Sequence, residues 1–334
     1  MSRLILKSFN KNRPIWLMRQ AGRYLKEYQR IRKKQKNFID FCLNVKSATQ
    51  VTLQPVKKFD LDAAIIFSDI LIIPYALGQK VTFEENTGPI LGNLNLRNLK
   101  LITEKKFKRK IQNVYKAIKL TRKKLDKKKS LIGFAGSPWT LLVYMLNKKS
   151  PKKKFNLNVK RHRKISNLIR LLEKFIIIHI EQQIIAGADT IQLFDSWAGL
   201  IETKQLDDFC FKPHKRIIRK IKKKFPHIPI ICFPKGIGKN IVNFCKIAKP
   251  DCINIDSEIN TSYVNKKISN KIIIQGGLNP KFLLGNKQEM ENKAKHYLKK
   301  FENRPYIFNL GHGVDKRTKP SNVHTLIKIV RKFS

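Results

Sequence analysis

Eight short apolar runs recur along the chain, and each is followed by a polar or glycine-containing turn and then by a helical pattern. Most of these runs are hydrophobic at almost every position, which is typical of strands buried on both faces of a parallel sheet. We predict strands at Ile15–Met18, Ala63–Phe67, Leu131–Ala135, Thr190–Phe194, Ile228–Phe233, Cys252–Ile255, Lys271–Ile274 and Tyr306–Leu310.

Amphipathic helices are predicted between the strands. In residues 104–126, the positions Phe107, Ile111, Val114 and Ile118 recur at spacings of three and four, which places them on one apolar stripe. Similar patterns predict helices over 164–186, 204–224, 280–301 and 320–333, and a small hairpin is predicted at Val81–Gly88.

A strand that alternates with a helix eight times predicts an α/β fold, a single (β/α)8 TIM barrel that forms one domain over residues 1–334. The competing topology is an open doubly wound sheet, but no Gly-x-Gly-x-x-Gly turn follows the first strand. In a barrel of this kind the active-site cleft lies at the C-terminal ends of the strands. The residues that follow each predicted strand are therefore the candidates for chemistry.

Arginines and a carboxylate follow the first two predicted strands. Arg19 and Arg23 are four residues apart, so they share a face if this stretch is a helical turn, and two guanidiniums suit carboxylates or phosphates. The alternative is a pair of solvated arginines in a basic protein. Asp69 either caps a helix or accepts N–H groups and stabilises a developing positive charge.

Three more polar side chains lie near the ends of later strands. Tyr144 faces either the mouth of the barrel or the core, and Ser196 has no Gly-x-Ser-x-Gly context that would indicate a nucleophile. His312 lies between two glycines, where an imidazole reaches a ligand or is simply solvated. We find no spacing that predicts a metal site or a nucleotide cofactor. The set suits a small polyanionic substrate but does not identify the reaction.

The chain carries 71 Lys and Arg against 23 Asp and Glu, which gives a formal net charge of +48. Such a charge raises the possibility of nucleic-acid binding, but the lysines lie along the whole sequence and no RNA- or DNA-binding signature is present. Isoleucine and asparagine are also abundant, and all three residue types have A/T-rich codons. Biased nucleotide composition is the favoured explanation, with steering of a polyanionic substrate as the alternative.

Neither a membrane span nor a secretory signal is predicted. No apolar run approaches about 18 residues, and the first apolar stretch is too short for a signal peptide. We therefore expect a cytoplasmic protein. The five cysteines contain no Cys-x-x-Cys pair, so they favour buried thiols over a disulfide framework or a zinc site.

Seven segments together resemble the uroporphyrinogen decarboxylase family, and they follow the order of that family along the chain. They are Arg13–Tyr28 (RPIWLMRQAGRYLKEY), Thr52–Leu71 (TLQPVKKFDLDAAIIFSDIL), Gly133–Met145 (GFAGSPWTLLVYM), Gly187–Gly199 (GADTIQLFDSWAG), Phe233–Gly236, Gln275–Pro280 and Phe308–Val314 (FNLGHGV).

The resemblance implies a (β/α)8 barrel, usually a homodimer, that acts in haem and porphyrin biosynthesis. The family removes the four acetate carboxyl groups of uroporphyrinogen III, an octacarboxylate tetrapyrrole, and yields coproporphyrinogen III without a metal or organic cofactor. By the same resemblance, the substrate-binding residues are Arg19, Gln20, Ala21, Gly22, Arg23, Asp69, Tyr144, Ser196 and His312.

Of these residues, Asp69 matches the essential carboxylate of the family. It can accept hydrogen bonds from the pyrrole N–H groups and stabilise the cation that forms when the pyrrole is protonated at carbon. Arg19, Tyr144 and His312 are the other candidate catalytic residues, and each is a candidate proton donor together with water. Arginine is a poor acid because its ordinary pKa is so high.

Two rival functions are considered. A zinc-dependent methyltransferase acting on a corrinoid or thiol belongs to the same superfamily, but it needs thiolate and imidazole ligands. Cys232 is present on the predicted fifth strand, whereas residue 230 is Ile where that enzyme needs His. The second rival is a decayed barrel that binds polyanions or RNA, which the charge favours and the intact polar residues oppose.

Self-repulsion among the excess cations predicts a salt-sensitive fold. We expect the melting temperature to rise with ionic strength because salt screens exposed like charges that lie more than a Debye length apart. Thermal unfolding at low and high sodium chloride concentration measures this effect. A melting temperature that does not change with ionic strength would contradict it.

Overall fold

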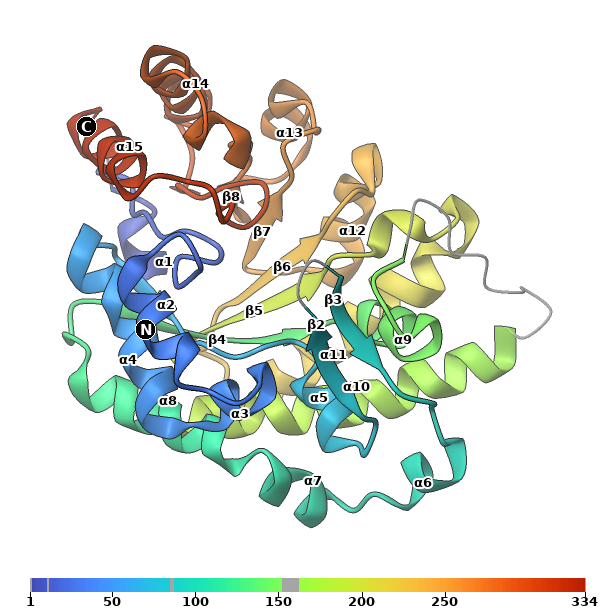
Figure 1. Ribbon diagram of the computed structural model, residues 1–334. Helices are drawn as coiled ribbons and strands as arrows, with labels where there is room; N and C mark the ends of the chain where they lie inside the picture. Colours follow the sequence, from blue (N-terminus) through green and yellow to red (C-terminus); the bar gives the residue numbers. More distant parts are fainter. Residues whose placement is uncertain (1, 11, 85–86, 152–161, 334) are drawn as a thin grey trace.

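A curled parallel sheet forms the centre of the computed structural model, which describes residues 2–10, 12–84, 87–151 and 162–333 (Figure 1). Its seven strands lie in the order β1-β4-β5-β6-β7-β8-β9. They are β1 (Ala63–Ile65), β4 (Ser130–Gly136), β5 (Thr190–Asp195), β6 (Ile230–Pro234), β7 (Cys252–Ile255), β8 (Ile273–Gly276) and β9 (Tyr306–Ile307). A separate antiparallel hairpin pairs β2 (Val81–Glu84) with β3 (Gly88–Leu91), as predicted.

Uniform burial explains the uniform hydrophobicity of these strands. Every residue of β4, β6 and β7 is buried, since the sheet is covered on both faces. Each strand pairs in parallel with its neighbour, so the carboxyl ends of all seven strands lie along one edge. The loops that leave this edge carry most of the predicted site residues.

Helices cover the outer face of the sheet and follow one another in contact around it (Figure 1). The contacts join α4 to α8, α8 to α10, α10 to α11, α11 to α12, α13 to α14, α14 to α15 and α15 back to α4. None of the helices in the described ranges is long and apolar enough to span a membrane.

The bounds of the helices are α1 (Arg3–Lys7), α2 (Lys26–Lys33), α3 (Phe38–Leu43), α4 (Val45–Phe59), α5 (Ile72–Ala76), α6 (Leu96–Leu101), α7 (Glu104–Lys110), α8 (Gln112–Lys124), α9 (Pro138–Asn147), α10 (His162–Ile185), α11 (Lys212–Lys224), α12 (Ile241–Ala248), α13 (Thr261–Lys267), α14 (Lys287–Lys300) and α15 (Pro320–Lys332). Short 3-10 turns are η2 (Ala198–Leu200), η3 (Thr203–Gln205), η5 (Gly238–Asn240) and η6 (Pro280–Leu283), and η4 (Asp207–Phe211) is a π-helical turn.

Three predicted helices are interrupted. The segment 280–301 begins with the 3-10 turn η6 and becomes α-helical only at Lys287. The segment 104–126 forms α7 and α8 with a break at Ile111, where the backbone leaves the helical region at φ −120°. The segment 204–224 begins with the turns η3 and η4 and becomes α-helical only at Lys212. The apolar stripe of the segment 104–126 continues across its break, because Phe107, Ile111 and Ile118 are all buried.

The predicted first strand, Ile15–Met18, is not a strand in the structure. Only Ile15 forms an isolated parallel bridge, with Phe308, so an eight-stranded barrel was expected and seven strands are observed. The reason is that side chains take the N–H groups that a strand would use in its ladder. Leu17 N–H donates to Gln20 Oε1 (3.1 Å) and Met18 N–H donates to Asn309 Oδ1 (3.0 Å).

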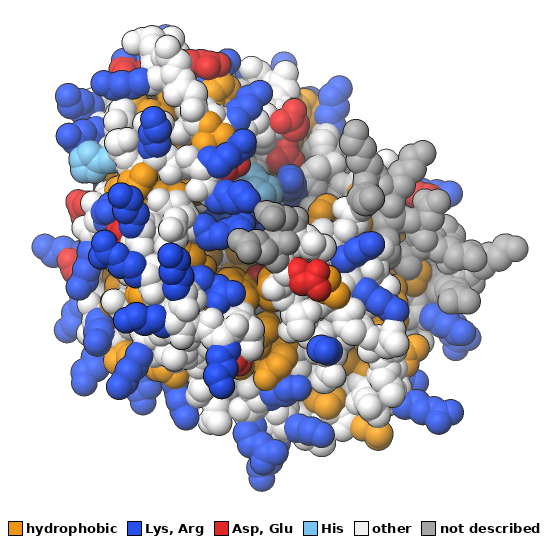
Figure 2. All heavy atoms as spheres, viewed as in Figure 1, with side chains coloured by type: hydrophobic (Ala, Val, Ile, Leu, Met, Phe, Trp, Pro, Cys, Tyr) orange, Lys and Arg blue, Asp and Glu red, His pale blue; other side chains and the backbone are white. Residues whose placement is uncertain are grey.

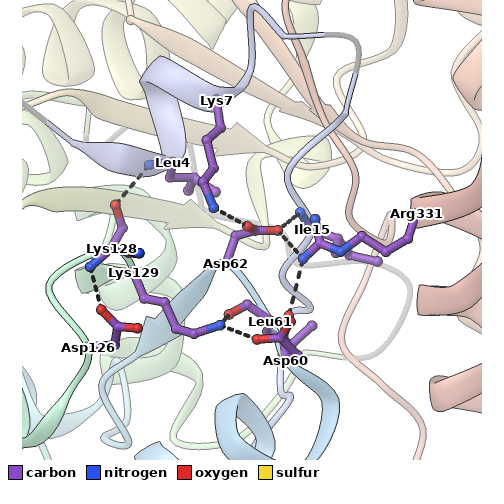
Figure 3. Close-up of polar contacts among 11 residues, drawn as sticks. Leu4, Lys7, Ile15, Asp60, Leu61, Asp62, Asp126, Lys128, Lys129 and Arg331 are labelled. Atoms are coloured by element: carbon purple, nitrogen blue, oxygen red, sulfur yellow. Dashed lines mark hydrogen bonds and ion pairs between the residues drawn. The ribbon is translucent and has the colours of Figure 1, made fainter. Parts of the chain in front are cut away.

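The third of these side chains is Asp62, which joins the segment to the edge strand β1 (Figure 3). Asp62 N–H donates to Ile15 O (2.9 Å), and Ile15 N–H donates to Asp62 Oδ2 (2.8 Å). The same carboxylate pairs with Lys7 (2.8 Å) and Arg331 (2.7 Å), while only 3% of the Asp62 side chain is exposed. One carboxylate therefore ties α1, the segment Ile15–Met18 (the bridging segment) and α15 to the start of β1.

The same reciprocal pair of hydrogen bonds occurs at two other strand junctions. Leu131 N–H donates to Asp189 Oδ2 (3.1 Å) and Asp189 N–H to Leu131 O (3.0 Å), just before β5. Ile230 N–H donates to Asp251 Oδ2 (2.8 Å) and Asp251 N–H to Ile230 O (3.2 Å), just before β7. Each carboxylate again pairs with a helix cation, Arg122 for Asp189 and Lys222 for Asp251. We call these three units the aspartate clamps.

Replacement of the clamp carboxylate of Asp62 is expected to destabilise the fold. Asp62→Asn leaves two cations without their partner and puts an N–H₂ group against other donors. We expect it to lower the free energy of unfolding by about 2–3 kcal/mol.

Urea unfolding measures the change, with Asp60→Asn as the matched control. Asp60 lies two residues away and pairs with Lys129, but its side chain is 86% exposed, so its loss should cost under about 1 kcal/mol. Equal losses in the two variants would show that the clamp geometry contributes nothing.

Candidate active site

Arg19 leaves the bridging segment in a backbone conformation that is rare for a residue with a side chain. Its φ is +59°, in the left-handed region, and the stretch from 18 to 24 consists of turns and bends rather than a helix. Arg19 and Arg23 therefore do not share a helix face, which the sequence analysis had considered. A non-glycine residue held at positive φ costs about 1–3 kcal/mol and is found preferentially at functional sites.

The residues next to Arg19 hold this turn in place. The Gln20 side chain is fully buried, and its amide accepts from Leu17 N–H and donates to Ala63 O (3.0 Å). Tyr24 O–H donates to the Gln20 carbonyl (2.8 Å). The Gln20 side chain thus supports the turn from the core side. Because the side chain is occupied there, only the backbone of Gln20 remains to contact a ligand.

Ala21, Gly22 and Arg23 complete the turn at the surface. Ala21 and Gly22 are half-buried, and a side chain at Gly22 would bring its Cβ to 3.0 Å from Arg19 O. Arg23 is exposed. Glycine at position 22 therefore permits the tight approach of the backbone to Arg19, and the two arginines stay accessible to a ligand.

Asp69 lies in the loop between β1 and α5, half-buried at the carboxyl edge of the sheet. Its Oδ1 accepts the N–H of Leu71 (2.8 Å), which fixes the carboxylate while leaving Oδ2 available. Burial raises the pKa of Asp69 to about 6, against the smaller opposing effects of the Leu71 hydrogen bond and of Arg19. Asp69 is thus a carboxylate at neutral pH, but one held in poorly hydrated surroundings.

Tyr144 on α9 lies close to this carboxylate. Burial raises the pKa of Tyr144, and the charge of Asp69 raises it further. The ring packs edge-on against Trp197 with centroids 5.9 Å apart. Tyr144 is half-buried and packs against the core, and the charges of Asp69 and Arg19 both act on its hydroxyl group. Ser196 precedes Trp197 in the turn that directly follows β5, where it is half-buried.

His312 is positioned by the two glycines that flank it. A Cβ at Gly311 would lie 2.5 Å from Ser257 N, and one at Gly313 would lie 2.3 Å from Arg19 Cδ. The glycines are needed for this close approach, since neither adopts a positive φ. Burial, then the positive charges of Lys235 and Arg19, lower the pKa of His312 to about 4. The imidazole is therefore neutral at physiological pH, and the charges of two cations act on it.

Arg19, Asp69, Tyr144 and His312 thus form one group, which we call the rim cluster. Arg19 is its centre, because its charge acts on Asp69, Tyr144 and His312 alike. Lys and Arg side chains are spread over the whole face seen in Figure 2, so positive charge alone would not have located the cluster. What distinguishes it is the convergence of an arginine, a poorly hydrated carboxylate and a neutral histidine.

Lys235, in the turn after β6, was not among the predicted site residues. It lowers the pKa of His312, and burial and Arg19 lower its own pKa. A lysine among 71 basic residues carries no signal in sequence. The available indications were its place directly after a strand and its position in the matching segment Phe233–Gly236.

A second polar group lies buried beneath the Ser196 turn. Thr140 O–H donates to Asp195 Oδ1 (2.6 Å) and accepts Trp197 N–H (3.0 Å). Asp195, Cys210 and His214 have donor atoms within 4.8 Å of one another, close enough to hold a metal ion. However, both His214 nitrogens already have partners, Ser137 Oγ at 2.9 Å and Cys210 O at 2.8 Å, so the group fits a network that supports the turn.

Comparison with known proteins places these observations in a family. The uroporphyrinogen decarboxylase (URO-D) family model matches residues 5–333. The chain is 45% identical over 332 residues to uroporphyrinogen decarboxylase of Rickettsia bellii (strain RML369-C), covering 98% of this chain and 97% of that protein. It is 41% identical over 341 residues to uroporphyrinogen decarboxylase of Orientia tsutsugamushi (strain Ikeda), covering 98% of each.

Among solved structures, a methyltransferase from Methanosarcina mazei superposes with a TM-score of 0.78 at 15% sequence identity. The match covers 99% of this chain and 98% of that one. At this identity the likeness concerns the fold alone.

The raised pKa of Asp69 predicts a pH-dependent contribution to stability. Between its ordinary pKa of 3.8 and about 6, the folded chain holds a proton that the unfolded chain has released. Stability is therefore lost as the pH rises through this window. Relative to Asp69→Asn, the wild-type chain should lose roughly 1–2 kcal/mol of unfolding free energy between these two pH values.

Urea unfolding of both proteins across this pH range measures the difference. Asp126→Asn serves as the matched control, because the exposed Asp126 carboxylate lies before β4 at the opposite edge of the sheet. A wild-type minus Asp69→Asn difference that stays flat with pH would mean that Asp69 is well hydrated in the folded chain.

Proposed function

The chain belongs to the uroporphyrinogen decarboxylase family and is a carboxy-lyase, and we propose that it performs this reaction at the rim cluster. The proposed substrate is uroporphyrinogen III, and the proposed product is coproporphyrinogen III, formed by loss of the four acetate carboxyl groups. The juxtaposition of Asp69 and Arg19 at the carboxyl edge of the sheet is the observation that carries the assignment of the site.

Arg19 and Arg23 are assigned to the carboxylates of the substrate. A guanidinium offers two parallel N–H donors to a carboxylate, and both arginines are exposed. Arg19 also stands beside Asp69. A substrate whose acidic groups contact Arg19 therefore brings its pyrrole rings toward the Asp69 carboxylate. Tyr144, Ser196 and the neutral His312 are assigned to further polar contacts.

Asp69 is assigned to the developing positive charge. Decarboxylation becomes easy once a pyrrole ring is protonated at carbon, because the cationic ring accepts the electron pair of the breaking C–C bond. Carbon dioxide leaves, a proton taken up at the exocyclic carbon completes the methyl group, and the proton first added to the ring carbon is lost, which restores the neutral pyrrole. A fixed carboxylate with little hydration stabilises the cation more strongly than water does.

The proton donor is drawn from Arg19, Tyr144, His312 and water. Burial disfavours a charged His312 near neutral pH, so His312 would act as a neutral hydrogen-bond partner. Tyr144 has a raised pKa, which makes it a weaker acid than an ordinary tyrosine. Arginine is also a poor acid because its ordinary pKa is so high, so water is the favoured donor.

We propose further that the bridging segment around Ile15 takes the place of the eighth strand of a (β/α)8 barrel. The aspartate clamp of Ile15 and Asp62 repeats the clamps that join β4 to β5 and β6 to β7. The bridge to Phe308 supplies the link toward β9 on the other side.

A homodimer and a cytoplasmic location are also proposed. The homodimer rests on the family alone. The location is supported by the five cysteines, all of which are free and buried, as suits a reducing compartment.

The rival functions have less support. Cys232, the thiol that a zinc-dependent methyltransferase would use, is fully buried next to other core residues, and burial raises its pKa well above the ordinary value. A decayed barrel that binds polyanions would not require a poorly hydrated carboxylate next to Arg19.

Asp69→Asn is expected to lower kcat for uroporphyrinogen III about 10²–10³-fold, since it removes the charge that stabilises the cation and keeps the shape. Anaerobic incubation followed by chromatography of products with seven to four carboxylates measures it. In the wild-type chain, kcat should also fall as the pH drops through about 6, where Asp69 takes up a proton.

Asp126→Asn again provides the control and should keep wild-type turnover, because its carboxylate is exposed and lies away from the rim. No products from folded wild-type protein would overturn the reaction. Equal turnover by Asp69→Asn would overturn the role of Asp69.

A further inference from the structure

We propose that Lys235 is a further substrate-binding residue, which holds a carboxylate of the substrate on the His312 side of the rim cluster. The proposal rests on the proposed function and adds a second cationic contact across the rim from Asp69. Lys235 lies in the matching segment Phe233–Gly236, but it is not among the predicted site residues.

The backbone of Lys235 is fixed by two neighbouring parts of the sheet edge. Its N–H donates to Asp195 O (3.1 Å) at the end of β5, and its carbonyl accepts Gly199 N–H (2.9 Å). Gly236 N–H, the next along the chain, donates to Asp256 Oδ2 (2.8 Å) in the loop after β7. The Cα of Lys235 is therefore held from both sides, as expected of a residue that must present its side chain at a defined place.

Close packing of two glycines makes this turn tighter still. A Cβ at Gly199 would lie 2.8 Å from Gly236 O, and Gly236 itself has a φ of +81°. Side chains at these positions would push the loops after β5 and β6 apart. The turn therefore holds the backbone of Lys235 close against the loop that follows β5.

Lys235 is half-buried, and its ammonium group lacks a partner. No ion pair or hydrogen bond joins the Lys235 side chain to another group in the ranges that the structure describes. Burial lowers its pKa, and the positive charge of Arg19 lowers it further. A desolvated cation without a counter-ion is costly, so this site gains free energy when an anion arrives.

The nearest acidic residues are occupied elsewhere. Asp256 and Glu258 oppose the lowering of the Lys235 pKa, so both lie within electrostatic reach. However, Asp256 Oδ2 accepts Gly236 N–H and Asp256 Oδ1 accepts Glu258 N–H (3.1 Å), so this carboxylate caps its own loop. Glu258 is exposed and takes a hydrogen bond from Ser257 (3.2 Å).

His312 explains why the missing anion should come from the substrate. Lys235 and Arg19 both act on His312 and both lower its pKa, so a neutral imidazole lies within electrostatic reach of two cations. Two cations cannot pair with each other, whereas a carboxylate placed near His312 can meet both. A substrate with eight carboxylates supplies such a group while another part of it lies against Asp69.

Lys235→Met tests the proposal by removing the charge and keeping most of the side-chain length. We expect KM for uroporphyrinogen III to rise about tenfold with a much smaller change in kcat, since a charge-assisted contact is lost from substrate binding. Lys235→Arg should restore most of the affinity. Lys239→Met is the matched control: Lys239 is an exposed lysine four residues on, above the ring of Tyr263, and its loss should change KM less than about twofold.

Two readouts separate a binding role from a structural one. Fluorescence titration with uroporphyrin I, the oxidised octacarboxylate, reports binding without turnover, and Kd should weaken about tenfold in Lys235→Met. The NMR titration of His312, assigned by its absence in His312→Gln, should shift from about 4 toward its ordinary value of 6.5 once the Lys235 charge is gone. A lysine that only supports the loop would lower stability and leave KM and Kd unchanged.

The outcomes distinguish this proposal from the proposed function. Unchanged KM and Kd in a folded Lys235→Met protein overturn the role of Lys235 even when the wild-type chain decarboxylates its substrate. Weakened porphyrin binding in a chain that shows no turnover supports Lys235 and overturns the reaction instead. Lys235→Gln replaces the Met variant if the latter does not fold.

Discussion

This structure depends on finding hydrogen-bond acceptors for buried backbone N–H groups that have no neighbouring strand to pair with. The backbone from Ile15 to Met18 crosses the gap between β9 and β1, where an unpaired N–H would cost about 1–3 kcal/mol. Three side chains supply the acceptors: Gln20, which lies next to the segment, and Asp62 and Asn309, which come from distant parts of the chain. Because these bonds set the course of the backbone, they also set where the next residue, Arg19, leaves it. Polar contacts where this segment crosses between β9 and β1 thus position the edge of the sheet that carries the candidate active site.

The electrostatics of the rim follow from that placement. Arg19 at positive φ reaches across Gly313 and acts on both Asp69 and His312. Burial moves these two groups in opposite directions, raising the pKa of the acid and lowering that of the base, because in both cases it disfavours the charged form. Near pH 7 the result is an ionised carboxylate, a neutral imidazole and unpaired cations. Such a site attracts a polyanion and retains one negative charge for the cation formed during the reaction.

The hydrophobic pattern was sufficient to predict seven strands and the hairpin, since strands buried on both faces differ plainly from amphipathic helices. It failed at Ile15–Met18, where the apolar run is buried but its N–H groups bond to side chains that no local pattern identifies. The site residues came from strand ends and from the resemblance. The left-handed turn at Arg19, the inward-facing amide of Gln20 and the place of Lys235 depend on contacts between segments far apart in sequence.

The few carboxylates of this chain show how a fold tolerates a net charge of +48. Asp62, Asp189 and Asp251 each accept a backbone N–H and pair with a helix cation, and no lysine could replace an acceptor there. On the exposed surface, by contrast, the identity of a charged side chain changes stability by only about 0–1 kcal/mol. Excess lysine therefore accumulates where it costs least, while the positions that need an acceptor keep a carboxylate. The same distinction separates the surface charge, which acts at long range, from the few cations fixed at the rim, which we assign to contacts with the substrate.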